Sequence, residues 1–212
     1  MVLQEKIPSP QPAAVASYDF VDVADRTGVR TFYLANSTLS GNTTYSLTQS
    51  VSYSSDKELS GNSAAGQMSD TDYDLTIFNL AQNIEGTAYA NIPFKILPGA
   101  GTVQGYLVVH LRKWDGTTET EIASATSNAI QATGGGASNQ IVHNLPLVIP
   151  SQTHFKPGES LRFTVEAWAN AVSGTYGYGI DPKDRSESWM RLTGQDATTA
   201  QSSIRIPFKL DI

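Results

Sequence analysis

The sequence predicts an all-β protein, namely an antiparallel two-sheet β-sandwich, jelly-roll-like, with an extended N-terminal arm. Three observations lead to this prediction. Apolar and polar residues alternate over long stretches, a period typical of half-buried antiparallel strands. Turn sequences rich in Gly and Pro separate these stretches. Finally, no window carries the apolar stripe of an amphipathic helix.

The composition agrees with this fold and excludes several functions. Charged residues make up 16% of the chain, against about 25% in an average protein, and Ser and Thr supply much of the remaining polarity. The net charge of −6 argues against nucleic-acid binding, which favours a basic surface. The absence of cysteine excludes a disulfide scaffold, Cys-based zinc sites and thiol catalysis. We expect neither a secretory signal nor a transmembrane segment.

Residues 1–16 are predicted to form the extended arm. Pro8, Pro10 and Pro12 alternate, which blocks a helix and favours polyproline II or edge-strand geometry. Two interpretations stay open: a disordered tail, or an arm that docks on a neighbouring subunit.

Residues 17–212 are predicted to form a single sandwich domain. Within it, residues 37–71 are rich in Ser, Gly and Asn and are expected to be a long loop or a weak edge hairpin. The clearest strands are expected at 71–80, 88–97, 103–113, 141–149, 160–171 and 203–212. Their alternation predicts buried rows that include Phe94 and Ile96, Leu107 and Val109, Ile141 and Leu147, Phe163 and Val165, and Ile206 and Phe208.

The tetrapeptide Ile-Pro-Phe-Lys occurs twice, at 92–95 and 206–209, without matching flanks that would indicate a duplicated domain. Proline cannot donate to a sheet ladder, so Pro93 and Pro207 are each expected at an edge or a bulge. Lys95 and Lys209 beside them would deter edge-on aggregation. We interpret the pair as two edge-type strands of one sandwich that lie near one another.

Turn sequences define the connections between these strands. Asp115-Gly116 is a dipeptide that accepts positive φ, so residues 114–119 are predicted to be a hairpin turn. Three further breaks are expected at 97–101, 132–139 and 156–160.

No motif for catalysis or metal binding is complete. His110, His143 and His154 are isolated, and we interpret them as structural, with His143 in the buried row of its strand and His110 on the opposite face of its own. The acidic run at 70–74 lacks the Gly and Glu that an EF-hand requires, while a looser calcium site on Asp19, Asp22 and Asp25 stays open. Glu119 and Glu121 share a strand face like a glycosidase pair, but a solvated face explains them better. We expect no cofactor.

Aromatic residues supply the remaining candidate contacts. Trp168 is predicted to face away from the buried row of its strand. Tyr176 and Tyr178, near Asp181, lie in a Gly-rich segment, 173–186, that is expected to be an exposed loop, and Trp189 follows. Exposed aromatics beside small residues stack on sugar rings or anchor protein interfaces. Packing of the tryptophans beneath loops is the alternative.

Residues 100–170 resemble β-sandwich structural proteins of tailed phages and related viruses: capsid decoration, minor capsid or tail-associated proteins. The resemblance is carried by the strand–Asp-Gly turn–strand unit at 105–127, followed by Lys156-Pro157-Gly158-Glu159 and Leu161-Arg162 at a strand entry. It implies a jelly-roll virion component that is usually oligomeric, often trimeric, and that acts through whole surfaces.

We therefore expect a non-enzymatic virion structural protein, localised to the virion, whose partners are further copies of itself and other virion proteins such as a major capsid protein. The alternative is a carbohydrate-binding module or adhesin that holds host glycans with the 173–186 loop. The two hypotheses differ in a measurable way. The first predicts self-association, and the second predicts that an isolated monomer binds sugar.

Overall fold

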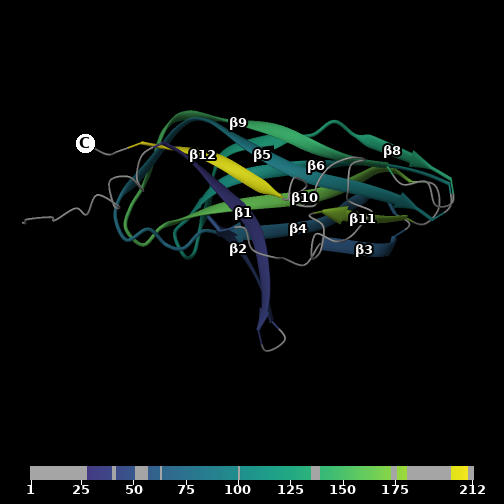
Figure 1. Ribbon diagram of the computed structural model, residues 1–212, viewed down its shortest axis with the longest axis horizontal. Coiled ribbons are helices and arrows are strands. Elements are labelled where there is room, and N and C mark those ends of the chain that lie inside the picture. The colour runs from purple at the N-terminus through teal and green to yellow at the C-terminus, as the bar shows by residue number, and fades with distance from the viewer. Residues whose placement is uncertain are drawn as a thin grey trace, which may run out of the picture.

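The computed structural model describes residues 28–39, 42–50, 57–62, 64–99, 101–134, 139–172, 176–180 and 202–209. All regular structure in these residues is β, which confirms the predicted fold class. The strands are β1 Gly28–Leu39, β2 Asn42–Thr48, β3 Lys57–Asn62, β4 Gly66–Asp74, β5 Gln82–Pro98, β6 Thr102–Trp114, β7 Glu119–Thr126, β8 Ile130–Thr133, β9 Asn139–Phe155, β10 Ser160–Val172, β11 Tyr176–Ile180 and β12 Ser203–Lys209 (Figure 1).

The strands form two facing layers that are joined into one continuous sheet. Their order is β3-β11-β5-β12-β1-β2-β4-β10-β6-β7, with β9 on the free side of β5 and β8 beside β6. The hairpin β1–β2 joins the layers, because β1 pairs with β12 and β2 with β4. The β2–β4 contact is parallel, and the other described pairs are antiparallel. Across the core, β5 contacts β6 and β8, and β9 contacts β7 and β8.

The alternating rows predicted from the sequence face the core. Phe94, Leu107, Leu147 and Phe163 are fully buried, and Ile206 joins them from the last described strand. These residues belong to one hydrophobic cluster that draws on both layers. Ile141 departs from the prediction with 42% exposure, because it lies close to the start of β9, at the end of the buried row.

Two of the four predicted turns, at 114–119 and 156–160, are fully described and present. The β6–β7 hairpin turns at 115–118, where Gly116 has a φ of 95° and the Asp115 carboxylate accepts hydrogen bonds from the backbone of Thr117 and Thr118. These bonds lower the pKa of Asp115. Between β9 and β10, Gly158 has a φ of 90° and the Glu159 carboxylate accepts from the Lys156 backbone at 2.8 Å.

The two Ile-Pro-Phe-Lys strands lie side by side, as predicted, but neither is an edge strand. β5 lies between β9 on one side and β12 and β11 on the other, and β12 lies between β5 and β1. Pro93 falls in the gap where the partner of β5 changes from β12 to β11. Pro207 lies at a bulge in the β12–β5 pairing. A missing N–H donor is tolerated at both places because the ladder is already interrupted there.

The two lysines that follow these prolines differ in their exposure to solvent. Lys95 was expected to deter aggregation at an exposed edge, but it is only 3% exposed and lies in the middle of the sheet. Lys209 is exposed and pairs with Glu85 at 2.6 Å.

Strands occur both in 37–71, predicted to be a long loop or a weak edge hairpin, and in 173–186, predicted to be an exposed loop. Residues 37–71 include β2, β3 and the start of β4, of which β3 ends the strand order. In the segment 173–186, residues 176–180 form β11, which pairs with both β3 and β5. Tyr176 is 3% exposed, and its hydroxyl donates to the Ala64 carbonyl at 2.9 Å. The prediction of an exposed loop at 173–186 is therefore wrong for Tyr176.

Candidate interaction surfaces

Four neighbouring strands, β9, β5, β12 and β1, present one outward face, which we call the β5 outer face. Its side chains alternate with the buried rows, so Tyr89 points outward between buried Ala88 and Ala90. In the register, Tyr89 lies opposite Pro146 on β9 and Arg205 on β12. Residues distant in the sequence thus meet on a single surface.

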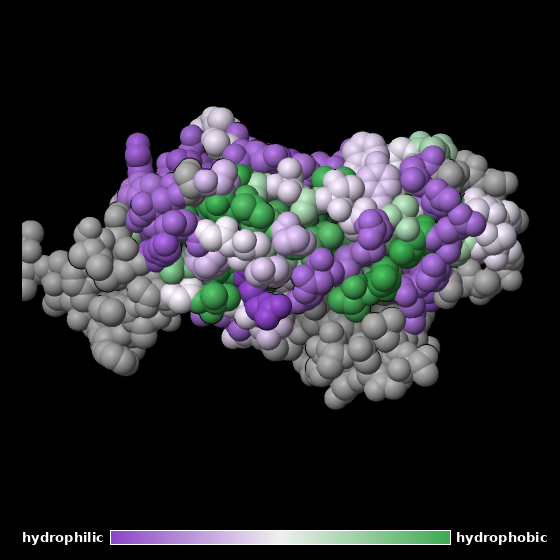
Figure 2. All heavy atoms as spheres, turned by 90° about the horizontal axis from the view of Figure 1, so that it is seen from above, coloured by the Kyte–Doolittle hydropathy of each residue, from purple (hydrophilic) through white to green (hydrophobic). Residues whose placement is uncertain are grey.

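This face carries exposed apolar side chains where an outward strand position is usually polar. Val29 is 69% exposed, Val148 is 66% exposed and Tyr89 is 42% exposed. Figure 2 looks onto the side on which β9 lies, and there apolar residues gather in patches between polar ones.

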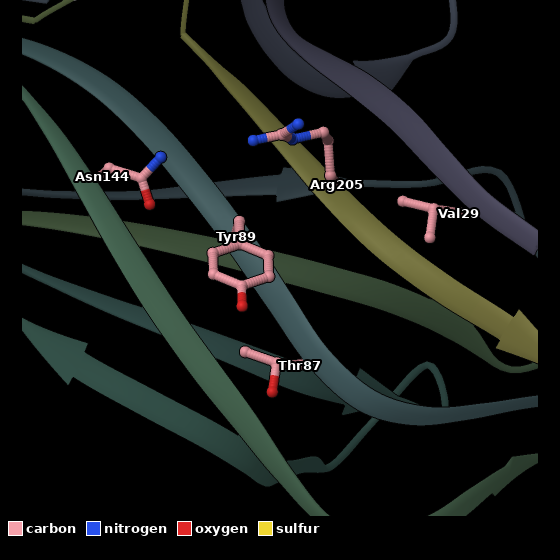
Figure 3. Close-up of a pocket in the computed structure, with 5 residues that line it drawn as sticks. All are labelled: Val29, Thr87, Tyr89, Asn144 and Arg205. Atoms are coloured by element: carbon pink, nitrogen blue, oxygen red, sulfur yellow. The ribbon is translucent and has the colours of Figure 1, made fainter.

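A pocket of 340 Å³ opens on the β5 outer face, lined by Val29, Thr87, Tyr89, Asn144 and Arg205. Tyr89 lies in the middle of this group, with Asn144 on one side and Arg205 and Val29 on the other (Figure 3). The volume lies within the range of small-ligand pockets, about 300–1,000 Å³. The pocket therefore combines an aromatic ring and an aliphatic wall with hydrogen-bond donors from the guanidinium and the amide.

Contacts between the neighbouring strands hold the pocket residues in position. The Asn144 amide donates to the Asn91 side-chain oxygen at 2.8 Å, which ties β9 to β5 beside the pocket. The register shifts between Ile84 and Gly86 in the β5–β9 pairing, and between Arg205 and Phe208 in the β12–β5 pairing. Bulges of this kind re-aim nearby side chains and increase the local twist.

The opposite outward face, on β4, β10, β6 and β7, is charged instead of apolar. At its centre Arg162 donates two bonds to Asp74, at 2.6 and 2.7 Å, and pairs with Asp72 at 3.3 Å and with Glu119. The guanidinium also lies 4.3 Å from the centre of the Trp114 ring. The hydrogen bonds to Asp74 raise the pKa of Arg162 further above its ordinary value.

A second part of this charged face contains His110 and Trp168. The His110 ring nitrogens lie 2.7 Å from a Glu121 oxygen and 3.4 Å from a Glu166 oxygen. Trp168 points outward, as predicted, donates to Glu166 at 2.7 Å and stacks on Tyr106 with ring centres 6.4 Å apart. A catalytic triad needs one imidazole nitrogen next to a nucleophile, so His110 is not arranged as a triad base.

Carboxylates outnumber cations on the charged face, and this affects Asp70. Partial burial raises the pKa of Asp70, and the nearby carboxylates of Asp72 and Glu166 raise it further. Even so, no group of three or more His, Asp or Glu side chains is arranged to hold a metal ion in the part of the chain that the structure describes.

The structure separates the residues that the sequence singled out. Trp168 lies on the charged face, Lys209 and Pro207 lie on the β5 outer face, and Pro93, Lys95 and Tyr176 are buried. The arm residues, the side chain of Tyr178 and two further positions lie outside the described set: Pro8, Pro10, Pro12, Asp181 and Trp189.

Sequence reasoning missed the pocket residues. A signal for the surrounding face existed, because Tyr89 in the pocket and Val148 outside it are apolar residues at the polar positions of alternating strands. The sequence gives no means of bringing these two residues to Val29 and Arg205, since that contact depends on the strand order.

No protein-family model matches this chain, and neither does any curated protein sequence. Solved structures do match. A CocE/NonD family hydrolase from Staphylococcus aureus aligns with a TM-score of 0.50 and 14% identity, over 86% of this chain and 37% of the hydrolase. An aminopeptidase from a Thaumarchaeota archaeon of marine sediment aligns with a TM-score of 0.53 and 8% identity, over 86% of this chain and 37% of the enzyme.

These two structures contradict the expectation that the chain is not an enzyme. Their likeness shows that this fold occurs within hydrolases, so an all-β sandwich without an evident catalytic motif is no ground for excluding catalysis. The likeness shows the fold alone. The chain spans little more than a third of each hydrolase, and no residue role is carried over.

The VP2 protein of infectious bursal disease virus also aligns, with a TM-score of 0.32 and 10% identity, over 94% of this chain and 39% of VP2. A TM-score this low does not establish a shared fold. Of what the resemblance to viral structural proteins implies, only the all-β fold is therefore found. No helix among the described residues is long and apolar enough to cross a membrane.

Proposed function

We propose that this chain is a structural subunit of a virus particle that acts by docking the β5 outer face onto other protein chains. One observation carries the proposal: Val29, Tyr89 and Val148 are strongly exposed on one outward face. Contiguous exposed apolar surface marks interaction sites, and aromatic residues are enriched in interface cores.

The construction of the face supports docking. The Tyr89 ring and the two valines are held on paired strands, so little conformational entropy is lost when a partner covers them. Arg205 and Asn144 at the pocket can hydrogen-bond with a partner's backbone. The β6–β7 hairpin turn and the β9–β10 turn, which carry the sequence resemblance to virion proteins, are both present in the structure.

Light scattering behind a sizing column tests this proposal on the full chain. We expect assemblies larger than the 22.8 kDa monomer at micromolar concentration. Tyr89→Ser combined with Val148→Ser should shift the mass toward the monomer. The matched control is Ile77→Ser with Leu80→Ser, which removes apolar residues of 57% and 43% exposure elsewhere on the surface and should change nothing. A wild-type monomer, or an equal effect of both double variants, would overturn the proposal.

The pocket favours glycan binding as a second candidate function. A tyrosine ring flanked by Arg205, Asn144 and Thr87 offers a stacking surface and polar contacts to a sugar. The site differs from the 173–186 loop expected from the sequence, where Tyr176 is buried. A glycan array tests it. Binding that Tyr89→Ser abolishes and Tyr89→Phe retains would support a sugar site, and no binding to any glycan would reject it.

A further inference from the structure

We infer that the pocket on the β5 outer face receives the proline-rich segment 7–12 of a second copy of the chain. The inference rests on the proposed function, since it names the partner of the docking face. It joins two features that are separate in the sequence, namely the alternating prolines of the arm and the pocket around Tyr89.

The chemistry of the two partners matches. The prolines at 8, 10 and 12 block a helix in segment 7–12 and favour polyproline II geometry. A polyproline II chain makes no internal hydrogen bonds, so its carbonyl groups need external donors. Grooves that bind such chains combine aromatic surface with a few donors. At this pocket Tyr89 and Val29 supply the apolar surface, and Arg205 and the Asn144 amide supply donors.

The lengths match as well. Six residues of polyproline II extend about 19 Å, and four strands side by side also span about 19 Å. The segment can therefore cross the face from β9 to β1. Ordering the segment on binding costs little free energy, because the prolines have already removed much of its backbone conformational entropy.

The chain that leaves β1 is long enough to reach another copy. The described strand begins at Gly28, next to the pocket residue Val29. Residues 13–27, which connect it to the segment, extend up to about 50 Å. A domain of this size has a radius of gyration of about 17 Å, so this reach exceeds its diameter. An arm that passes head-to-tail from copy to copy closes a ring if the rotation allows.

The area of the face also suits a short segment better than a second folded surface. A patch four strands wide and four residues long covers about 250 Å². A stable interface buries about 800 Å² on each partner. The flat patch alone is too small for two folded copies to dock face to face, whereas a six-residue segment that lies across it needs no larger surface.

Photo-crosslinking in the full chain tests the inference. A photo-reactive phenylalanine incorporated in place of Gln11 lies between two of the prolines. Copies labelled with ¹⁴N and ¹⁵N are mixed, irradiated and digested. We expect cross-links to peptides that contain Tyr89, Asn144 or Arg205, about half of them joining the two labels. Tyr89→Ser should reduce them several-fold, and Ile77→Ser should not.

Three outcomes overturn the inference: no cross-link, cross-links to other surfaces, or cross-links within single labels only, which would place the arm on its own copy. If any of these occurs while Tyr89→Ser with Val148→Ser still lowers the assembly mass, the docking face stands and only its partner is wrong. As an independent measurement, a free peptide of residues 1–16 should compete for the cross-link. A peptide with Pro8→Gly, Pro10→Gly and Pro12→Gly should compete several-fold less well.

Discussion

Arg162 and Arg205 lie on opposite outer faces and differ in whether their guanidinium groups form ion pairs with described residues. Arg162 has a side chain only 12% exposed and is paired with three carboxylates. Arg205 is exposed on the β5 outer face and makes no ion pair within the described residues. A guanidinium that is already paired mainly stabilises the fold, whereas an unpaired one beside an exposed tyrosine is available to a partner. This contrast leaves the guanidinium of Arg205 available to a partner that covers the β5 outer face.

Arg162→Met should lower the free energy of unfolding by about 2 kcal/mol, because it leaves Asp74 without its cation and leaves Asp72 and Glu119 with Arg112 alone in a partly buried network. Lys209→Met is the matched control. It breaks the Lys209–Glu85 pair, whose side chains are 53% and 42% exposed, and should cost less than about 1 kcal/mol. Urea unfolding of both variants measures the difference, and equal losses would contradict this account of the network.

Asp70→Asn should stabilise the fold at neutral pH. The pKa of Asp70 is raised in the folded chain, so its ionised form is less favourable folded than unfolded, and this cost grows as pH rises above the ordinary value of 3.8. The urea midpoint of Asp70→Asn should therefore exceed that of the wild type at pH 7 and equal it at pH 3. A gain of the same size at both pH values would show that charge is not its cause.

Among the structural elements, alternation identified the core faces of the long strands but not their neighbours. The side-chain period says which residues share a face, while the position of a strand within a sheet depends on pairing with distant segments. Pro93 is accordingly expected at an edge or a bulge, and Lys95 at an edge, yet both are buried in a central strand. Of the two places expected for Pro207, an edge or a bulge, the bulge is found, because a proline limits its own ladder wherever the strand lies.

Short strands in polar or Gly-rich segments were missed for a different reason. β11 reads Tyr-Gly-Tyr-Gly-Ile, a composition that favours a turn, yet it pairs on both sides. Its backbone hydrogen bonds to β5 and β3 hold it in place, and these are invisible to a side-chain pattern. The pocket could not be predicted for a related reason, since its five residues come from four strands that only the strand order brings together.

Close packing of β6 against its neighbours makes Gly105→Ala a sharp test of the layered arrangement. A Cβ at Gly105 would lie 2.7 Å from Cδ1 of Ile96 in the facing layer and 2.9 Å from the carbonyl oxygen of Trp168 on paired β10. Because the backbone oxygen cannot move cheaply, we expect a loss of about 1–3 kcal/mol. Thr120→Ala, at an exposed position of β7, should cost less than about 1 kcal/mol. A neutral Gly105→Ala would mean that the layers are further apart.

The whole molecule is organised around its first and last described strands. β1 and β12 lie next to each other in the middle of the strand order, where they connect β5 of one layer with β2 and β4 of the other. The C-terminal strand therefore completes the sheet. Its buried residues Ile204, Ile206 and Phe208 join the same hydrophobic cluster as residues of β6 and β10.

This organisation predicts that the described domain unfolds as one cooperative unit. Ile206→Val removes one buried methylene group from β12 and should cost about 0.5–1.5 kcal/mol. Trp114 and Trp168 lie on β6 and β10 in the other layer. Tryptophan fluorescence and far-ultraviolet circular dichroism should nonetheless report the same urea midpoint in the wild type and the same decrease in the variant, because losing a contact in a shared core destabilises both layers equally. A fluorescence transition that stays in place while the dichroism shifts would mean that the layers unfold independently. The β1–β12 connection would then join two separate units instead of closing a single core.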